Sequence, residues 1–293
     1  MSGSASTESC PSIAGLYTGR CIALLTQHGK EQVIAPVLDA ALGCQVERVS
    51  GFDTDTLGTF TRDIPRAGTQ LEAARRKART GMELSGLPLG LASEGAFGPN
   101  PVVSLLPWNI ELLLLIDDER GIEVTGVAQQ STRFDHLLTD DWERAKQFAA
   151  QAGFPTHYLV VRPQCQDDSR VEKGIDTWAA LEAAFQRARG QAENGQVFLE
   201  SDVRAHAHPA RMAVIRMAAE DLATKLNSLC PACGTPGFWT VERVAGLPCA
   251  DCGAPTREIR AIINGCLQCD HRETHQQTGV EYADPGRCDY CNP

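Results

Sequence analysis

The stretch RAGTQLEAARRKARTGMELSGLPLGLASEGAFG, from Arg66 to Gly98, decides how the rest of the chain is placed. Its first half has the three- and four-residue apolar spacing of an amphipathic helix, at Leu71, Ala74, Ala78 and Met82. Gly86 is expected to end this helix, and Leu87–Leu91 is expected to form an apolar strand. We expect Ser93-Glu94-Gly95 to turn out of that strand into an acidic, glycine-rich loop. A carboxylate just after a buried strand is a common place for a metal or phosphate site in an open α/β fold.

The residues before this stretch follow strand and helix patterns in turn. Cys21–Thr26 predicts an apolar strand, Gly29–Leu42 a helix, and Cys44–Val49 a second strand. A β-α-β opening of this kind predicts a sheet with at least one parallel pair. Phe52–Pro65 is rich in Asp, Thr and Gly without a sustained period, so we expect a loop that is either functional or mobile.

After Gly98 the pattern predicts an antiparallel hairpin followed by alternating helices and strands. The expected elements are the hairpin strands Asn109–Asp117 and Ile122–Ala128, helix Thr139–Gly153, strand His157–Arg162, helix Asp176–Arg189, strand Val197–Glu200 and a helix from Pro209 to about Leu229. Residues 15–228 are therefore predicted to form one α/β domain with a mixed sheet and a cleft. Residues 1–14 are expected to form a disordered tail, and 229–293 a separate small region.

Composition limits the class of protein. At 293 residues the chain exceeds the usual size of one domain, so a large and a small domain are the default. A formal charge of −10 argues against general nucleic-acid binding, because phosphate backbones need a basic surface. The chain has no run of eighteen apolar residues and no signal-like N-terminus, so we expect no membrane association and a cytoplasmic location. The six basic residues between Arg62 and Arg79 suit a small anion, and a solvated helix face explains them equally well.

Eight of the twelve cysteines form four Cys-x-x-Cys pairs near the end of the chain. In a chain without an export signal this pattern indicates metal rather than disulfides. The pairs are Cys230 with Cys233, Cys249 with Cys252, Cys266 with Cys269, and Cys288 with Cys291. Two pairs can close one tetrahedral S₄ site, so two structural zinc ions are predicted.

The region 229–293 is interpreted as two zinc ribbons in series, in which the first pair joins the second. A cross-brace that joins the first pair to the third agrees with the spacing as well. Because four cysteines close each site, we expect the zinc ions to be structural. The region holds five basic and eight acidic residues, so a protein partner is a better candidate for the ribbons than a nucleic acid.

The central stretch also resembles a known family. In inosine/xanthosine triphosphatase-type pyrophosphatases, a helix with an L-x-G/A-A-R-x-K/R-A pattern precedes a strand that ends in an acidic residue and glycine. The similar residues here are Leu71, Ala73, Ala74, Arg75, Lys77 and Ala78, then Glu94 and Gly95. The family's first strand ends T-x-N-P-x-K; Thr26-Gln27-His28-Gly29-Lys30 is similar but one residue shorter and without the Asn. Over its whole length the chain also resembles an uncharacterised bacterial family with C-terminal cysteine pairs, which implies no activity.

The pyrophosphatase resemblance implies a metal-dependent hydrolase that cleaves a nucleoside triphosphate between its α- and β-phosphates, with Mg²⁺ or Mn²⁺. Glu94 would be the first metal ligand and Glu72 the second, while Lys30 would meet a phosphate at the start of its helix. The other candidate ligand-binding residues are Thr26, His28, Arg75, Lys77, Arg204 and His206.

Several of these residues have structural alternatives. Thr69-Gln70-Leu71-Glu72 is a capping box, and we favour that role for Glu72. Glu94 is equally well explained as a plain loop carboxylate. Helix capping by Asp202 with a solvent-facing His206 is the alternative for the segment around Arg204.

Two other functions compete with the hydrolase. A non-catalytic module of the same fold would bind a nucleotide or another phosphorylated small molecule, which suits the missing Asn. A scaffold protein would hold a partner through its zinc ribbons and bind no small ligand.

Overall fold

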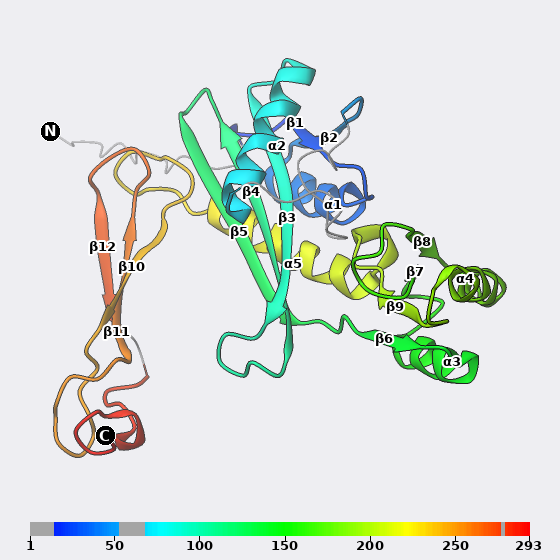
Figure 1. The fold of residues 1–293 in the computed structure, drawn as a ribbon. Helices are drawn as coiled ribbons and strands as arrows, with labels where there is room; N and C mark the ends of the chain where they lie inside the picture. The colour runs from blue at the N-terminus through cyan, green and yellow to red at the C-terminus, as the bar shows by residue number, and fades with distance from the viewer. Residues whose placement is uncertain (1–14, 53–67, 277–278) are drawn as a thin grey trace, which may run out of the picture. The chain divides into compact units, whose positions relative to one another are not determined.

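The computed structural model describes residues 15–52, 68–276 and 279–293, and the chain divides into two compact units (Figure 1). The large unit is Gly19–Leu222, and the small unit combines Met1–Thr18 with Ala223–Pro293. The tail predicted for 1–14 and residues 53–65 of the predicted loop lie outside the described residues. Within the described part, no helix has the length and hydrophobicity that a membrane crossing requires.

The large unit contains a mixed five-stranded sheet in the order β2-β1-β3-β4-β5. Its strands are β1 (Cys21–Leu25), β2 (Gln45–Val49), β3 (Leu89–Pro99), β4 (Pro107–Asp117) and β5 (Ile122–Ser131). β1 pairs in parallel with β2 and β3, while β3, β4 and β5 are antiparallel. The predicted mixed sheet, its β-α-β opening through α1 (Glu31–Leu42) and the later hairpin are confirmed.

Helix α2 (Gln70–Ser85) covers one face of this sheet. Its N-terminus is held by a capping box, in which the Thr69 hydroxyl accepts from the Glu72 amide and the Glu72 carboxylate accepts from the Thr69 amide. The capping role of Glu72 is thus confirmed. Gly86, with a φ of 70°, ends the helix as predicted. The apolar face packs against the sheet through Ala74, Ala78, Met82, Ala92, Leu114 and Ile116.

Helix α5 (Pro209–Leu226) lies against the opposite face of the sheet. A side chain at Gly126 of β5 would overlap the Ala218 carbonyl group, so this glycine lets helix and strand approach closely. The Val127 amide donates a hydrogen bond of 2.8 Å to the Asp221 carboxylate. The sheet is therefore enclosed between α2 and α5.

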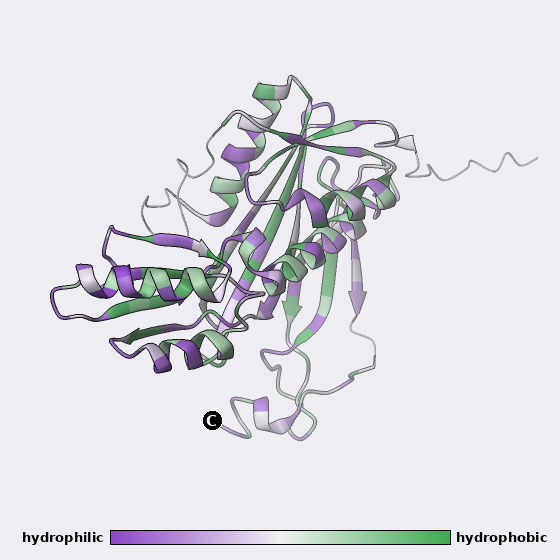
Figure 2. Cartoon of the chain, turned by 90° about the vertical axis from the view of Figure 1, so that its right-hand side faces the viewer, coloured by the Kyte–Doolittle hydropathy of each residue, from purple (hydrophilic) through white to green (hydrophobic). Residues whose placement is uncertain are grey.

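A second, antiparallel sheet in the order β6-β9-β7-β8 completes the large unit, so the expectation of a single sheet there is wrong. Its strands are β6 (His136–Thr139), β7 (Leu159–Pro163), β8 (Glu172–Ile175) and β9 (Val197–Ser201). Helices α3 (Trp142–Gln151) and α4 (Trp178–Gln191) pack on it (Figure 1). Both helices alternate between hydrophobic and hydrophilic residues, as amphipathic helices do (Figure 2). α3 begins later than predicted because Thr139 belongs to β6.

The expected turn at Ser93-Glu94-Gly95 is wrong, because β3 continues to Pro99. Gly95 pairs with Glu111 of β4, and a side chain at Gly95 would overlap both the Glu111 carboxylate and the Arg211 guanidinium. The glycine serves close packing inside a strand and not a change of direction. Glu94 is consequently a buried strand residue and not a loop carboxylate.

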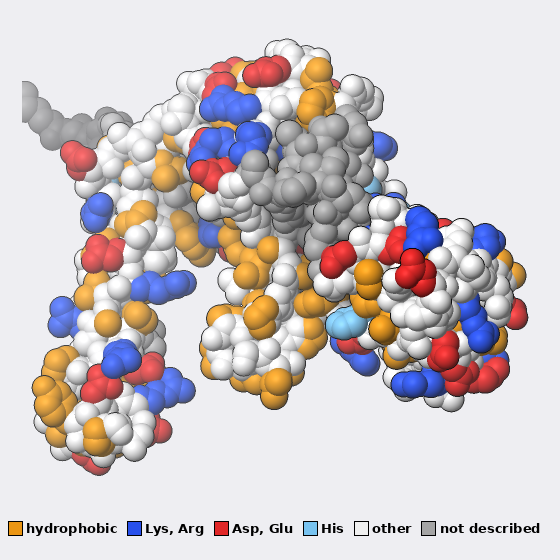
Figure 3. Space-filling model, viewed as in Figure 1, with side chains coloured by type: hydrophobic (Ala, Val, Ile, Leu, Met, Phe, Trp, Pro, Cys, Tyr) orange, Lys and Arg blue, Asp and Glu red, His pale blue; other side chains and the backbone are white. Residues whose placement is uncertain are grey.

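The loop between β3 and β4 presents apolar side chains to solvent. Val102 and Leu105 are 89% and 94% exposed, and orange side chains gather at this tip in Figure 3. The Asn100 side chain accepts hydrogen bonds from the amides of Val102 and Val103, which orders the turn. No charged residue occurs between positions 95 and 110, so the tip is an uncharged apolar surface.

The small unit contains an antiparallel sheet in the order β10-β11-β12. Its strands are β10 (Trp239–Ala245), β11 (Ile259–Gly265) and β12 (Arg272–Gln276). The sequence pattern at Phe238–Val241 and Thr256–Ile263 indicates strands close to the first two, whereas β12 is polar throughout and gives no such signal. The cysteine pairs precede, connect and follow these strands.

Candidate functional site

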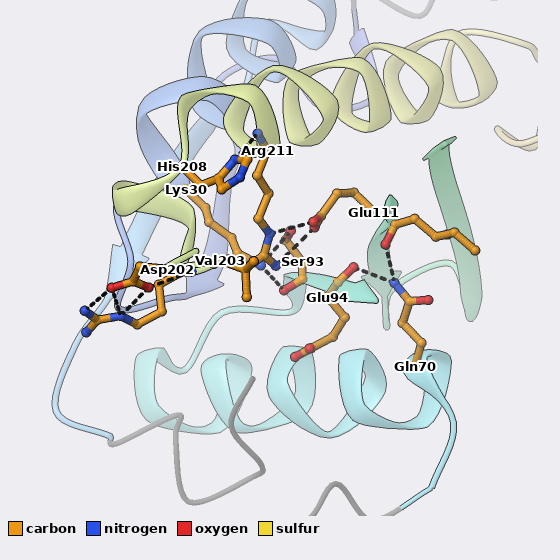
Figure 4. Close-up of polar contacts among 11 residues, drawn as sticks. Lys30, Gln70, Ser93, Glu94, Glu111, Asp202, Val203, His208 and Arg211 are labelled. Carbon is orange, nitrogen blue, oxygen red and sulfur yellow. Dashed lines mark hydrogen bonds and ion pairs between the residues drawn. The ribbon is translucent and has the colours of Figure 1, made fainter. Parts of the chain in front are cut away.

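A lysine side chain occupies the edge of β3 beyond the point where β1 stops. The pairing of β1 with β3 ends at Leu91, although β3 continues for eight more residues. Lys30, just before α1, directs its Nζ to this edge and donates to the Ser93 carbonyl oxygen at 2.8 Å and to the Ser93 hydroxyl at 3.2 Å (Figure 4). Lys30 is only 7% exposed. It therefore replaces the missing neighbouring strand with a charged side chain.

An ion pair lies on each face of the sheet beside Lys30. On the α2 face, Lys77 Nζ is 2.5 Å from Glu94 Oε1. On the α5 face, Arg211 Nε donates to Glu111 Oε1 at 2.7 Å. All four paired side chains are at most 15% exposed. Together with Lys30 they form what we call the Lys30 cluster. Counted over these five described residues, three cations meet two carboxylates, an excess of one formal positive charge.

Burial makes the Lys30 ammonium titrate near neutrality. Loss of water around the group, together with the nearby Arg211 cation, lowers its pKa to about 7. The carboxylates of Glu111 and Glu94 raise the pKa of Lys30, but they do not restore the usual lysine pKa. Lys30 therefore loses its charge as the pH rises through about 7.

A histidine cap places Arg211 in the cluster. His208 precedes α5, and its Nδ1 accepts a hydrogen bond of 3.2 Å from the Arg211 amide. Its Nε2 lies 3.1 Å from the Arg133 carbonyl oxygen, to which it donates in this tautomer. Burial lowers the pKa of His208 to about 4, so the ring stays neutral and keeps its acceptor nitrogen. The Arg211 guanidinium also donates to the Val203 carbonyl oxygen, which completes its fixation.

Several of the predicted ligand-binding residues come together near Lys30. Thr26 is buried at the end of β1. The His28 and His206 rings, predicted from motifs far apart in the sequence, have centroids 5.3 Å apart. A Cβ on Gly29, next to Lys30, would lie 4.0 Å from the His206 Cβ. Thr26, His28, Lys30 and His206 thus belong to one neighbourhood, and Lys77 and Glu94 belong to the cluster itself.

Three other predicted residues are engaged in separate contacts. Glu72 forms the capping box. The Arg75 guanidinium forms a bidentate ion pair with the Glu123 carboxylate, with nitrogen–oxygen distances of 2.7 to 3.0 Å. Arg204 binds the Asp202 carboxylate at 2.6 Å. Asp202 accepts from the Arg204 amide and does not cap α5, so the predicted capping of that helix by Asp202 is wrong.

Sequence reasoning missed four residues of the site. Gln70 of α2 donates to the Glu94 and Ile110 carbonyl oxygens at 2.7 and 3.2 Å, which ties the helix to two strands. Ser93, Glu111 and Arg211 were missed as well. The only available signal was an acidic residue, Glu111, inside an apolar strand, because a charge there needs a buried partner.

Metal-ligand geometry is found in the small unit. Within the described residues, the groups of three or more candidate ligands close enough to share an ion are two sets of four cysteines. One set is Cys230, Cys233, Cys266 and Cys269, and the other is Cys249, Cys252, Cys288 and Cys291. No such group of carboxylates or histidines surrounds Glu94 in the described residues, so the Mg²⁺ or Mn²⁺ expectation gains no support there.

The cysteine sets fit zinc well. Four sulfurs at about 2.3 Å from a tetrahedral Zn²⁺ lie about 3.8 Å from one another. The sulfur–sulfur distances are 3.7 Å for Cys230–Cys269, 3.5 Å for Cys233–Cys266, 3.8 Å for Cys249–Cys291 and 3.6 Å for Cys252–Cys288. Each set can therefore hold a structural zinc ion with four thiolates and no open position.

The cysteine pairs combine as a cross-brace, and the interpretation as ribbons in series is wrong. The reason is the topology of the small sheet. The first pair precedes β10 and the third connects β11 to β12, so both lie at the end where Trp239 pairs with Gly265. The second pair connects β10 to β11 at the opposite end, and the fourth follows β12. Antiparallel strands therefore bring alternate pairs together.

A family model described as a domain of unknown function (DUF6671) matches residues 77–293. The chain belongs to this family. The DUF6671 match begins at Lys77 and includes both cysteine sets, together with Glu94, Glu111 and Arg211 of the Lys30 cluster. Neither a curated protein nor a solved structure matches this DUF6671 chain.

We expect two zinc ions per chain. The Cys230→Ser variant should show which Cys-x-x-Cys pairs share one zinc ion. Loss of one ligand weakens one S₄ site and frees its remaining thiols. In the cross-brace these are Cys233, Cys266 and Cys269. Alkylation followed by mass spectrometry should label those three first, with metal analysis giving about one zinc per chain. Preferential labelling of Cys249 and Cys252 would show pairing in series.

The buried Arg211–Glu111 pair should matter strongly for stability. Arg211→Met leaves the Glu111 carboxylate buried without its partner and should lower the free energy of unfolding by about 3–5 kcal/mol. Replacing both residues, as Arg211→Met with Glu111→Leu, should recover most of this loss. Urea unfolding followed by circular dichroism measures both effects.

The exposed pair Arg216–Glu220 on the same helix provides the control. Arg216→Met should leave the unfolding midpoint nearly unchanged, because exposed ion pairs contribute little. Equal losses for Arg211→Met and Arg216→Met would contradict the assigned role.

Proposed function

We propose that the large unit binds a phosphorylated small molecule at the Lys30 cluster. The observation that carries this proposal is the excess of cations over carboxylates among the described side chains of this cluster, which are at most 15% exposed. Uncompensated buried charge is unfavourable, so such a cluster favours an anion that neutralises it. In the free protein Lys30 relieves the excess by losing its proton near pH 7. A bound phosphoryl group would relieve it by supplying negative charge.

The position of Lys30 in the fold also supports this proposal. Open α/β sheets bind ligands beyond the carboxyl ends of their parallel strands, and β1 ends just before the segment that carries Lys30. α1 starts at Glu31, so the positive end of its dipole lies at the same place. Helix, strand end and lysine thus favour the same ligand chemistry.

Hydrolysis of a phosphoric anhydride in a nucleotide is the second candidate function. It is favoured because Lys30, Lys77 and Glu94, which the pyrophosphatase resemblance pointed to, share one cluster. Glu94 would have to exchange Lys77 for a Mg²⁺ or Mn²⁺ ion that further ligands complete. The cations would then stabilise the charge that develops on the leaving phosphate.

Binding is tested by titrating tripolyphosphate and nucleoside triphosphates, including the inosine and xanthosine forms, into the full chain. We expect Lys30→Met and Lys77→Met to weaken binding at least tenfold in calorimetry, because each removes a cation from the cluster. Arg75→Met is the matched control on the same helix, since Arg75 is neutralised by Glu123 at the surface. Absence of binding to wild-type protein, or an equal loss in the control, would refute the proposal.

The same titrations, with Mg²⁺ or Mn²⁺ present, test hydrolysis through the release of pyrophosphate. If the chain turns over a nucleotide, Glu94→Gln should reduce the rate on the order of a hundredfold. Binding that persists in wild-type protein without release of pyrophosphate would support the binding module over the enzyme.

Affinity for the anion should fall as the pH rises from 6 to 8. Lys30 has a lowered pKa of about 7, so it is charged below this value and neutral above it. The free energy of unfolding of the ligand-free protein should rise with pH above 7. In this range the Lys30 ammonium has lost its proton in the folded chain but keeps it in the unfolded chain up to the ordinary lysine pKa, so a higher pH favours the folded state. Lys30→Met is the reference for both pH profiles. In this variant the ligand still changes its protonation with pH, but the lysine at position 30 no longer does. Identical pH profiles for the two proteins would contradict this assignment.

A further inference from the structure

A buried amide side chain lies next to the Lys30 cluster on β4. Asn109 is two residues before Glu111, so both side chains point to the α5 face of the sheet. Asn109 is 0% exposed. Neither its amide nitrogen nor its amide oxygen has a hydrogen-bond partner among the residues that the structure describes.

This arrangement is unusual for a folded protein. Buried side-chain amides nearly always have hydrogen-bond partners, because losing water without compensation is unfavourable. Exchanging the amide nitrogen and oxygen by a flip gives no remedy, since both atoms lack a partner. A leucine of similar size would fill the same position without polar atoms. The amide of Asn109 is therefore a group that packing alone does not explain.

The surroundings of Asn109 connect it to the proposed binding site. Asn109 lies directly opposite Phe97 of β3. The Arg211 guanidinium of the cluster lies 5.5 Å from the centre of the Phe97 ring. Phe134 packs edge-on against the same ring, with centroids 5.2 Å apart. The amide thus stands beside an aromatic surface that the cluster's own arginine touches.

We propose that Asn109 binds the polar edge of the ligand whose phosphoryl group the Lys30 cluster holds, an inference that rests on the proposed function. A carboxamide offers a donor and an acceptor side by side. Its complement is a ligand edge with an acceptor next to an N–H donor, as in an amide, a lactam or a nucleobase. The assigned ligand class is therefore a phosphorylated small molecule with an amide-like edge.

The spacing along β3 agrees with a ligand of this size. Ser93, which binds Lys30, and Phe97, which faces Asn109, are four residues apart. At about 3.3 Å per residue they are separated by roughly 13 Å. One small molecule can extend over this distance, with its phosphoryl group at Lys30 and its polar edge at Asn109.

Phe134 offers a route to the buried amide. It belongs to the connection 132–135 between β5 and β6 and not to a strand. Its ring can leave Phe97 without breaking a strand pairing. The ligand's edge would then replace the Phe134 contact, stack on Phe97 and satisfy both amide atoms.

The test compares ligands with and without such an edge in the full chain. Tripolyphosphate carries only the phosphoryl part, whereas ATP and ITP carry a purine edge as well. For Asn109→Leu we expect at least a tenfold loss of ATP or ITP affinity and less than a twofold change for tripolyphosphate. The melting temperature of the free protein should rise, because an unpaired buried amide has been removed. Gln130→Leu is the matched control, since this exposed amide lies opposite Asn109 on β5.

The outcomes separate this inference from the proposed function. Unchanged affinity for both ligand types in Asn109→Leu would overturn the inference and leave phosphoryl binding in place, with the amide serving at most a structural water. Failure of wild-type protein to bind either ligand type would overturn both. If Asn109→Leu does not fold, Asn109→Ser, which is smaller and polar, gives the same comparison of ligands.

Discussion

The buried contact between Arg211 and Glu111 holds the centre of the large unit together. It joins the first turn of α5 to β4 across a region that water does not reach. The contact depends on two local features, because Gly95 leaves room for both side chains and the His208 cap fixes the start of the helix. Buried ion pairs contribute little net stability but are costly to break. The pair therefore fixes the position of α5 more than it strengthens the fold.

The fixed ion pairs on both faces of the sheet contribute to the lowered pKa of Lys30. Its ammonium group lies at the end of β1 between carboxylates that already have cationic partners. Glu94 and Glu111 therefore do not neutralise it fully, and burial lowers its pKa to about 7. Local geometry that is rigid for structural reasons thus produces a charge that responds to pH and to anions.

Local patterns in the sequence predicted much of the fold. The capping box, the glycine stop of α2 and the β4–β5 hairpin follow from neighbouring residues, and the structure has all three. The missed strands β6, β8 and β12 are only four or five residues long, and β12 is polar throughout, so they gave no periodic signal. Gly95 was interpreted as a turn because a single sequence does not show that two distant charged side chains need its space.

The candidate site was harder to predict for the same reason. Lys30, Glu94 and Lys77 came from a motif, but Arg211 and Glu111 are one hundred residues apart and only the tertiary structure pairs them. For the cysteines, the ligands themselves could be predicted from the sequence, but the way they pair could not. Their identity and number were evident from the sequence, whereas their pairing follows from the strand order of the small sheet.

The cross-brace has a consequence for the protein during its synthesis. The ribosome releases the first and second cysteine pairs before the third, so the first four thiols available to zinc are not a native set. A zinc ion captured early by Cys230, Cys233, Cys249 and Cys252 would have to exchange two thiolates before the sheet could close. Native metal loading is therefore coupled to the arrival of β11 and to the pairing of its strands, and the order of emergence differs from the order of assembly.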